Sequence, residues 1–256
     1  MAQDGYFQYC EKLLQDWRES KITLTDGLES VFQLDHLPEP YLRFGDPSKT
    51  LILLTTNPGP GMPHQQRDEI EAGTSPVSAT ASYGHIAGAL GGWYWSNLKG
   101  TPSRRIGAML LLARSSGYTG ILQVESLPFH SAKVLKKPLM MKKVRTDAVL
   151  ENYIGHLRDF LRERAVIALA AVGTEESPGL DTIAKTPWLA WQADLMGFDL
   201  RGANVEPILQ KEEKTSCVLI TERGIGVPKG FILMMGGSHF PGPDGLERIA
   251  EVLRRP

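Results

Sequence analysis

The sequence predicts an α/β fold, a three-layer α/β/α arrangement around a central four-stranded, mostly parallel sheet. Two observations predict it. Apolar runs of strand length and segments with helical periodicity alternate along the 256 residues, which is the order that builds a parallel sheet with helices on its faces. The predicted strands are also apolar throughout instead of alternating with polar residues, which is typical of strands that are buried on both faces.

The periodicities place the elements in order. The chain opens with an amphipathic helix whose apolar face contains Tyr6, Cys10, Leu13, Leu14 and Trp17. Four short apolar runs predict strands at Thr50–Thr56, Ile121–Val124, Ala165–Val172 and Phe231–Met235. Further helices are predicted from Thr101-Pro102 to Gly117, from Asp147 to Leu161, from Ser177-Pro178 onward, and through Leu246 to Leu253.

Composition and charge exclude several classes of protein. Lys and Arg number 28 and Asp and Glu 29, for a net charge of −1, so the chain has no global positive field and any nucleic-acid contact needs a local basic patch. Two cysteines, Cys10 and Cys217, exclude a disulfide framework and a four-thiolate cluster, and we expect a cytoplasmic location. No apolar run approaches the ~18 residues of a membrane span, so no membrane partner is expected.

Three segments at the ends of predicted strands are candidates for a site, because open parallel sheets bind ligands at the carboxyl ends of their strands. They have the sequences TNPGPG at 56–61, ESLPFHS at 125–131 and GGSHFPGP at 236–243. Each is rich in Gly or Pro and holds at least one polar residue able to act on a ligand. One such segment alone indicates a tight turn, whereas three at corresponding strand ends predict a functional site.

These motifs resemble those of the uracil-DNA glycosylase superfamily, which has an early Gly-x-Asp/Asn-Pro-Gly/Tyr motif and a late His-x-Ser-Pro motif. The order and spacing match across residues 45–256, with departures: Thr55 replaces the leading Gly, the late motif reads Ser238-His239-Phe240-Pro241, and Glu125 stands where Asn is commonest. The resemblance implies a single domain over 1–256 with an N-terminal helical extension at 1–45.

The resemblance also implies two catalytic residues. Asn57 would position the water that attacks the sugar C1′, and His239 would donate a hydrogen bond to the pyrimidine O2 as charge develops on the leaving base. Backbone amides around Thr56 and Pro58 would frame the base edge. The alternatives are an Asn57 that only caps the Pro-Gly turn and a His239 bonded to a backbone carbonyl.

Two departures bear on specificity. A Glu125 carboxylate offers acceptors only, which suits the exocyclic amine of cytosine, whereas a protonated Glu125 could donate to cytosine N3. Gly59 takes the place where uracil-restricted members carry a Tyr that closes the pocket over C5, so a C5 substituent has room. Together they suggest a C5-modified cytosine, such as those in some phage genomes. The alternative for Glu125 is a salt bridge to a nearby lysine.

Other residues are candidates for base or DNA contact. Phe129 would stack on a flipped base or lie in the core. The stretch between Ser126 and Thr146 is basic and holds no acidic residue, which favours a loop that follows phosphates over a merely solvated face. The expected DNA-contacting residues are Gly61, Ser131, Lys133, Lys136, Lys137, Ser238, Pro241 and Gly242.

The sequence therefore predicts a monomeric, monofunctional DNA glycosylase that flips a pyrimidine nucleotide and leaves an abasic site. No lysine is placed for Schiff-base chemistry, so lyase activity is not expected, and neither is a cofactor or metal. Two alternatives stay open: a conventional uracil or mismatch repair glycosylase, and a non-catalytic DNA-binding module of the same fold.

Overall fold

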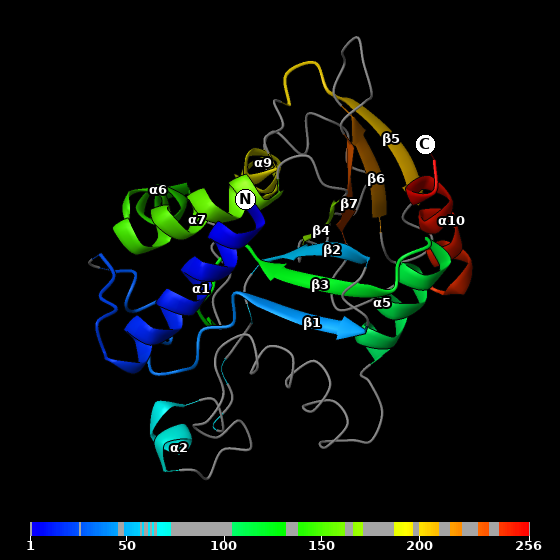
Figure 1. Cartoon of the computed structure of the whole chain (residues 1–256). Coiled ribbons are helices and arrows are strands. Elements are labelled where there is room, and N and C mark those ends of the chain that lie inside the picture. Colours follow the sequence, from blue (N-terminus) through cyan, green and yellow to red (C-terminus); the bar gives the residue numbers. More distant parts are fainter. Residues whose placement is uncertain are drawn as a thin grey trace.

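Seven strands form one mixed sheet in the computed structural model of the chain, and helices flank it (Figure 1). The structure describes residues 2–25, 27–45, 49–56, 58, 61, 63, 66–72, 104–131, 138–161, 166–170, 187–196, 200–209, 216–221, 230–235 and 241–255. The strands are β1 (Tyr41–Gly45), β2 (Thr50–Thr55), β3 (Gly120–Glu125), β4 (Val166–Ala170), β5 (Asn204–Leu209), β6 (Ser216–Thr221) and β7 (Gly230–Met235). Their order across the sheet is β1-β3-β2-β4-β7-β6-β5.

The four predicted strands are neighbours at the centre of this sheet, in the order β3-β2-β4-β7, and they run parallel to one another. The predicted total of four strands is wrong, because β1 pairs antiparallel with β3, and β6 and β5 extend the other side antiparallel. These added strands lie outside the strand–helix alternation. Pro207 lies in β5, at the edge of the sheet, where a strand tolerates a residue without a backbone N–H.

Apolar side chains cover both faces of the sheet, which explains why β2 is apolar without alternation. Ile52 and Leu54 belong to one buried cluster, together with residues of helices α1 (Ala2–Arg18), α7 (Ala148–Leu161) and α9 (Pro187–Leu195). Leu51 and Leu53 belong to a second cluster, with residues of α5 (Arg104–Ser115) and α10 (Pro243–Leu253). Successive residues of one strand therefore serve opposite cores.

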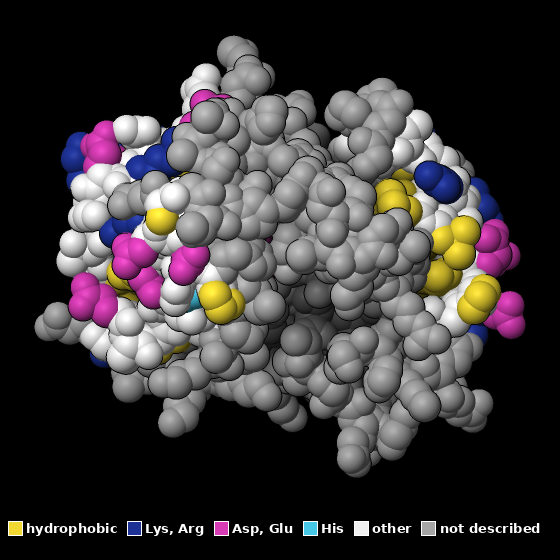
Figure 2. Space-filling model, turned by 90° about the horizontal axis from the view of Figure 1, so that it is seen from below, with side chains coloured by type: hydrophobic (Ala, Val, Ile, Leu, Met, Phe, Trp, Pro, Cys, Tyr) yellow, Lys and Arg dark blue, Asp and Glu magenta, His cyan; other side chains and the backbone are white. Residues whose placement is uncertain are grey.

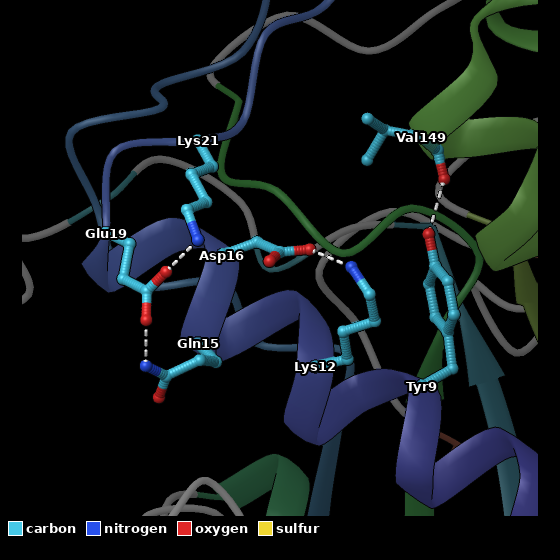
Figure 3. Close-up of polar contacts among 7 residues, drawn as sticks. All are labelled: Tyr9, Lys12, Gln15, Asp16, Glu19, Lys21 and Val149. Atoms are coloured by element: carbon cyan, nitrogen blue, oxygen red, sulfur yellow. Dashed lines mark hydrogen bonds and ion pairs between the residues drawn. The ribbon is translucent and has the colours of Figure 1, made fainter.

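The predicted first helix is confirmed as α1. Its apolar face is buried, with Tyr6 and Trp17 at most 1% exposed, and it packs in the same cluster as α7. Its outer face carries polar contacts within the helix and just beyond its end, among them Lys12–Asp16 and Lys21–Glu19 (Figure 3). The segment predicted as a helical extension also supplies strand β1, so its last residues, Tyr41–Gly45, are part of the sheet.

The remaining helices match the predictions in part. Helices α5 and α7 lie within the predicted segments, and α10 covers the predicted closing helix but begins earlier, at Pro243. The helix expected from Ser177-Pro178 begins outside the described residues. Three of the described helices were not predicted: α2 (Arg67–Glu71), α9 and α6 (Pro138–Thr146). Helix α6 corrects the expected phosphate-following loop, because Lys142, Lys143 and Arg145 lie on a helix. Every helix in the described ranges is too short or too polar to cross a membrane.

Candidate functional site

The topology brings the carboxyl ends of β2 and β3 together. From β2 the chain crosses to β3 on one side, and it later crosses to β4 on the other side of β2. In doubly wound sheets, ligands bind at the carboxyl ends of the strands next to such a change of direction. The predicted segments after β2 and β3 are therefore adjacent, whereas β4 separates β7 from β2.

The parallel pairing continues beyond the two strands. Thr55 and Glu125 are register partners at the last position of the ladder. Beyond it, the Ser126 amide and hydroxyl both donate to the Thr55 carbonyl, at 2.8 Å and 2.6 Å, and the Leu127 amide donates to the Thr56 carbonyl at 3.0 Å. The two predicted site segments thus leave the sheet side by side, and Thr56 is buried where they do so.

Glu125 is a buried acid at this junction, 2% exposed. The Gln123 side-chain amide donates a hydrogen bond to its Oε1 at 2.6 Å. Gln123 is also buried, and the two side chains share one face of β3 because they are two residues apart. A buried carboxyl group held in a defined direction at a strand end has the chemistry of a ligand-reading residue.

Two tyrosines from the helices hold the Glu125 backbone. The Tyr153 hydroxyl, on α7, donates to the Glu125 carbonyl at 2.6 Å, and the Glu125 amide donates to the Pro40 carbonyl at 2.9 Å. The Tyr6 hydroxyl, on α1, lies 3.1 Å from that of Tyr153 and 3.0 Å from the Pro40 carbonyl. Burial raises the pKa of Tyr153 well above its usual value, so its hydroxyl stays protonated and able to donate.

A loop before β1 connects the segments that follow β2 and β3. The Gln33 amide donates to the carbonyl of His130 at 2.9 Å, while the Gln33 side-chain oxygen accepts from the Gly61 amide at 2.9 Å. The Glu39 amide donates to the Pro128 carbonyl at 2.9 Å. Gln33 therefore contacts both predicted site segments and holds them at a fixed distance from each other at this end of the sheet.

Gly61 packs against the ring of His36. A Cβ atom built at Gly61 would lie 2.1 Å from Cδ2 of His36, closer than real Cβ contacts allow. His36 is 3% exposed, and its Nδ1 pairs with Asp35 at 2.9 Å, so the ring has little room to move away. The glycine predicted to contact DNA thus has a packing requirement of its own.

The structure describes several other predicted site residues, and most of them are buried. Phe129 is fully buried, with its ring in a T-shaped contact with Phe32, so its position matches the core alternative. The Ser131 hydroxyl donates to the Val31 carbonyl at 2.8 Å. Pro241 is buried and Gly242 is the exposed N-cap of α10. Pro58 is half-buried.

The other predicted site residues lie outside the described residues: Asn57, Gly59, Lys133, Lys136, Lys137, Ser238 and His239. Among the basic residues of α6, Arg145 pairs with Asp194 at 3.6 Å. In the view from below, acidic and basic side chains lie mixed on the side of α1 and α2, and hydrophobic ones gather on the side of α5 and α10 (Figure 2).

Sequence reasoning missed Gln123, Tyr6, Tyr153 and Gln33. The one signal present was a polar Gln123 inside an apolar strand, since a buried amide needs a partner.

Within the described ranges, no group of three His, Cys, Asp or Glu residues is arranged to hold a metal ion. Comparisons with family models, with curated proteins and with solved structures found no match to this chain.

Proposed function

We propose that the chain is a monofunctional DNA glycosylase that hydrolyses the N-glycosidic bond of a flipped pyrimidine nucleotide. The observation that carries the proposal is the register pairing of Thr55 with Glu125, which sets a buried carboxyl group beside the segment that contains Asn57. This pairing supports the proposal because the motif resemblance implies site residues in both of the segments that follow these strands. The proposed fold is the three-layer α/β/α fold of the uracil-DNA glycosylase superfamily.

The reaction needs water and no cofactor. The water oxygen bonds to C1′ as the C1′–N1 bond breaks, the bonding pair leaves with the base, and the proton lost by water neutralises the base. By the resemblance, Asn57 orients the water and His239 donates a hydrogen bond to O2 of the leaving base. A donor aimed at developing charge stabilises the transition state more than the ground state.

The proposed substrate is a C5-modified cytosine, of the hydroxymethylated or glucosylated kind found in phage DNA. Glu125 is an acceptor suited to an exocyclic amine, while the O4 of uracil would bring two acceptors face to face. By the resemblance, Gly59 takes the place of a Tyr that closes over C5 in uracil-restricted members, which favours a base with a C5 substituent. The partner is DNA, bound by a monomer through the basic residues between Ser131 and Pro138. A role in defence against phage follows from this substrate.

An abasic-site assay tests the proposal. Matched DNAs carry uracil, cytosine, 5-hydroxymethylcytosine or its glucosylated form, and the variants are Asn57→Ala and His239→Ala. Matched controls are Asn152→Ala and His156→Ala, because both residues are exposed on α7. We expect abasic sites in modified-cytosine DNA alone, with losses of about 100- to 1,000-fold in the site variants and none in the controls.

Other results would overturn the proposal in different ways. Release of uracil alone, retained in Glu125→Asn, would indicate a conventional repair glycosylase in which Glu125 forms a salt bridge. DNA binding without any abasic product would indicate the non-catalytic module. Equal losses in the site variants and in the α7 controls would show that the assay reports folding and not chemistry.

A further inference from the structure

Gln123 is a polar residue in the middle of strand β3, which is buried along its whole length. Its register partner on β2 is Leu53, and its neighbour on the same face of β3 is Ile121, both in the cluster beneath α5. Burying an amide there is unfavourable unless the amide is hydrogen-bonded. The described contact that satisfies it is Glu125, so the glutamine and the acid are buried as a pair.

The contact fixes the direction of the Glu125 side chain. The Gln123 Nε2 lies 2.6 Å from Oε1 of Glu125, so the amide N–H points at that oxygen. A carboxyl group has more than one acceptor position, and the bond from Gln123 orients the group through one of them.

We infer that Gln123 is a positioning and specificity-determining residue for base excision, an inference that rests on the proposed glycosylase function. Gln123 holds Glu125 as an oriented acceptor. In that orientation Glu125 accepts from the exocyclic amine of a cytosine-type base and disfavours the O4 of uracil, which is itself an acceptor.

The test compares two substrates in one assay. Abasic-site formation is measured on glucosylated hydroxymethylcytosine DNA and on uracil DNA for the wild-type chain, Gln123→Met, Gln123→Asn and the control Gln192→Met. Gln192, on α9, is fully buried, so its substitution matches the change in volume and burial. Gln123→Asn keeps an amide on a side chain that is shorter by one methylene group. It supplies a second variant if Gln123→Met does not fold.

We expect the ratio of kcat/KM for modified cytosine to that for uracil to fall about 10- to 100-fold in both Gln123 variants and to stay unchanged in Gln192→Met. Partial unfolding lowers both rates together and leaves this ratio unchanged. In a Glu125→Gln background, Gln123→Met should change the ratio no further, because Gln123 acts through the Glu125 carboxylate.

An unchanged ratio in the Gln123 variants of an active enzyme would overturn the inference and leave the proposed function standing. A further fall of the ratio in the Glu125→Gln background would also overturn it, because Gln123 would then act independently of Glu125. Absence of abasic product from the wild-type chain on every DNA would overturn the proposed function and the inference together.

Discussion

The Tyr153 hydroxyl donates a 2.6 Å hydrogen bond to the backbone carbonyl of Glu125, which joins helix α7 to the last residue of strand β3. The bond lies in the core, since both residues are at most 2% exposed. The Tyr6 hydroxyl extends it to α1 at 3.1 Å. Two helices from separate parts of the chain therefore fix the backbone from which the Glu125 side chain leaves the sheet.

Replacing Tyr153 by Phe removes this bond without changing the ring. We expect a loss of about 1–3 kcal/mol in the free energy of unfolding, because a buried carbonyl loses a donor. Urea denaturation measures it. The control is Tyr9→Phe, whose hydroxyl donates to the Val149 carbonyl at 3.0 Å in a half-buried position (Figure 3). Equal losses in both variants would show that removing the buried hydrogen bond lowers the free energy of unfolding no more than removing the half-buried one.

Asp147 caps helix α7 and also anchors the chain after α1. Its Oδ1 accepts from the amides of Val149 and Leu150 at 3.1 Å, and its Oδ2 accepts from the Thr25 amide at 2.6 Å and hydroxyl at 2.9 Å. Asp147→Ala should lower the free energy of unfolding by about 2–4 kcal/mol, the sum of a lost cap and lost charged bonds.

Asp147→Asn keeps one acceptor oxygen, so its loss should be about half as large. Thermal and urea denaturation of the two variants check this order. A loss in Asp147→Ala below about 0.5 kcal/mol, within the range of an ordinary surface substitution, would show that the cap and the anchor do not act in solution.

The sequence predicted the central part of the sheet and much less of its edges. β2 and β4 were predictable because burial on both faces makes their runs continuously apolar. β1 and β5 were not, because a strand at the edge of a sheet needs fewer apolar residues and tolerates Pro207. Helix α6 was not predicted, because a run of basic residues without acidic ones favours a phosphate-following loop as much as a helix.

The candidate site was predictable to a similar extent. Glu125 was found because it ends an apolar strand and departs from a motif. Its supports were not, because Tyr6 and Tyr153 reach it through tertiary packing and neither has a local pattern that points to β3. Gln123 differs, because an amide in the middle of an apolar strand predicts that a polar partner lies within reach.

The contact between Gly61 and His36 predicts a coupled pair. Gly61→Ala places a methyl group against a buried ring, so we expect a loss of about 1–3 kcal/mol in the free energy of unfolding. Adding His36→Ala removes the obstacle, so the double variant should be more stable than the sum of the single losses predicts, by about 1 kcal/mol or more. Urea denaturation of all four proteins measures this coupling.

Gly155→Ala is the matched control for that pair. Gly155 lies inside α7 with no atom within 4 Å of the added methyl group, so the substitution should stabilise the protein by up to about 1 kcal/mol through helix propensity. If the losses in the free energy of unfolding of Gly61→Ala and His36→Ala are strictly additive, the segment after β2 that contains Gly61 moves away from His36 in solution.

The interface between α1 and α7 should make stability fall in alkali. Burial, followed by the nearby Asp16 carboxylate, raises the pKa of Tyr9 to about 12, and burial also raises the pKa of Tyr153 well above its usual value of about 10. The folded state therefore holds these protons more tightly than the unfolded chain. For Tyr9, stability is fully present below about pH 10 and is lost as the pH rises toward 12. Urea midpoints measured between these limits should fall less steeply in Tyr9→Phe than in the wild-type chain, and identical slopes would show that Tyr9 ionises equally in both states.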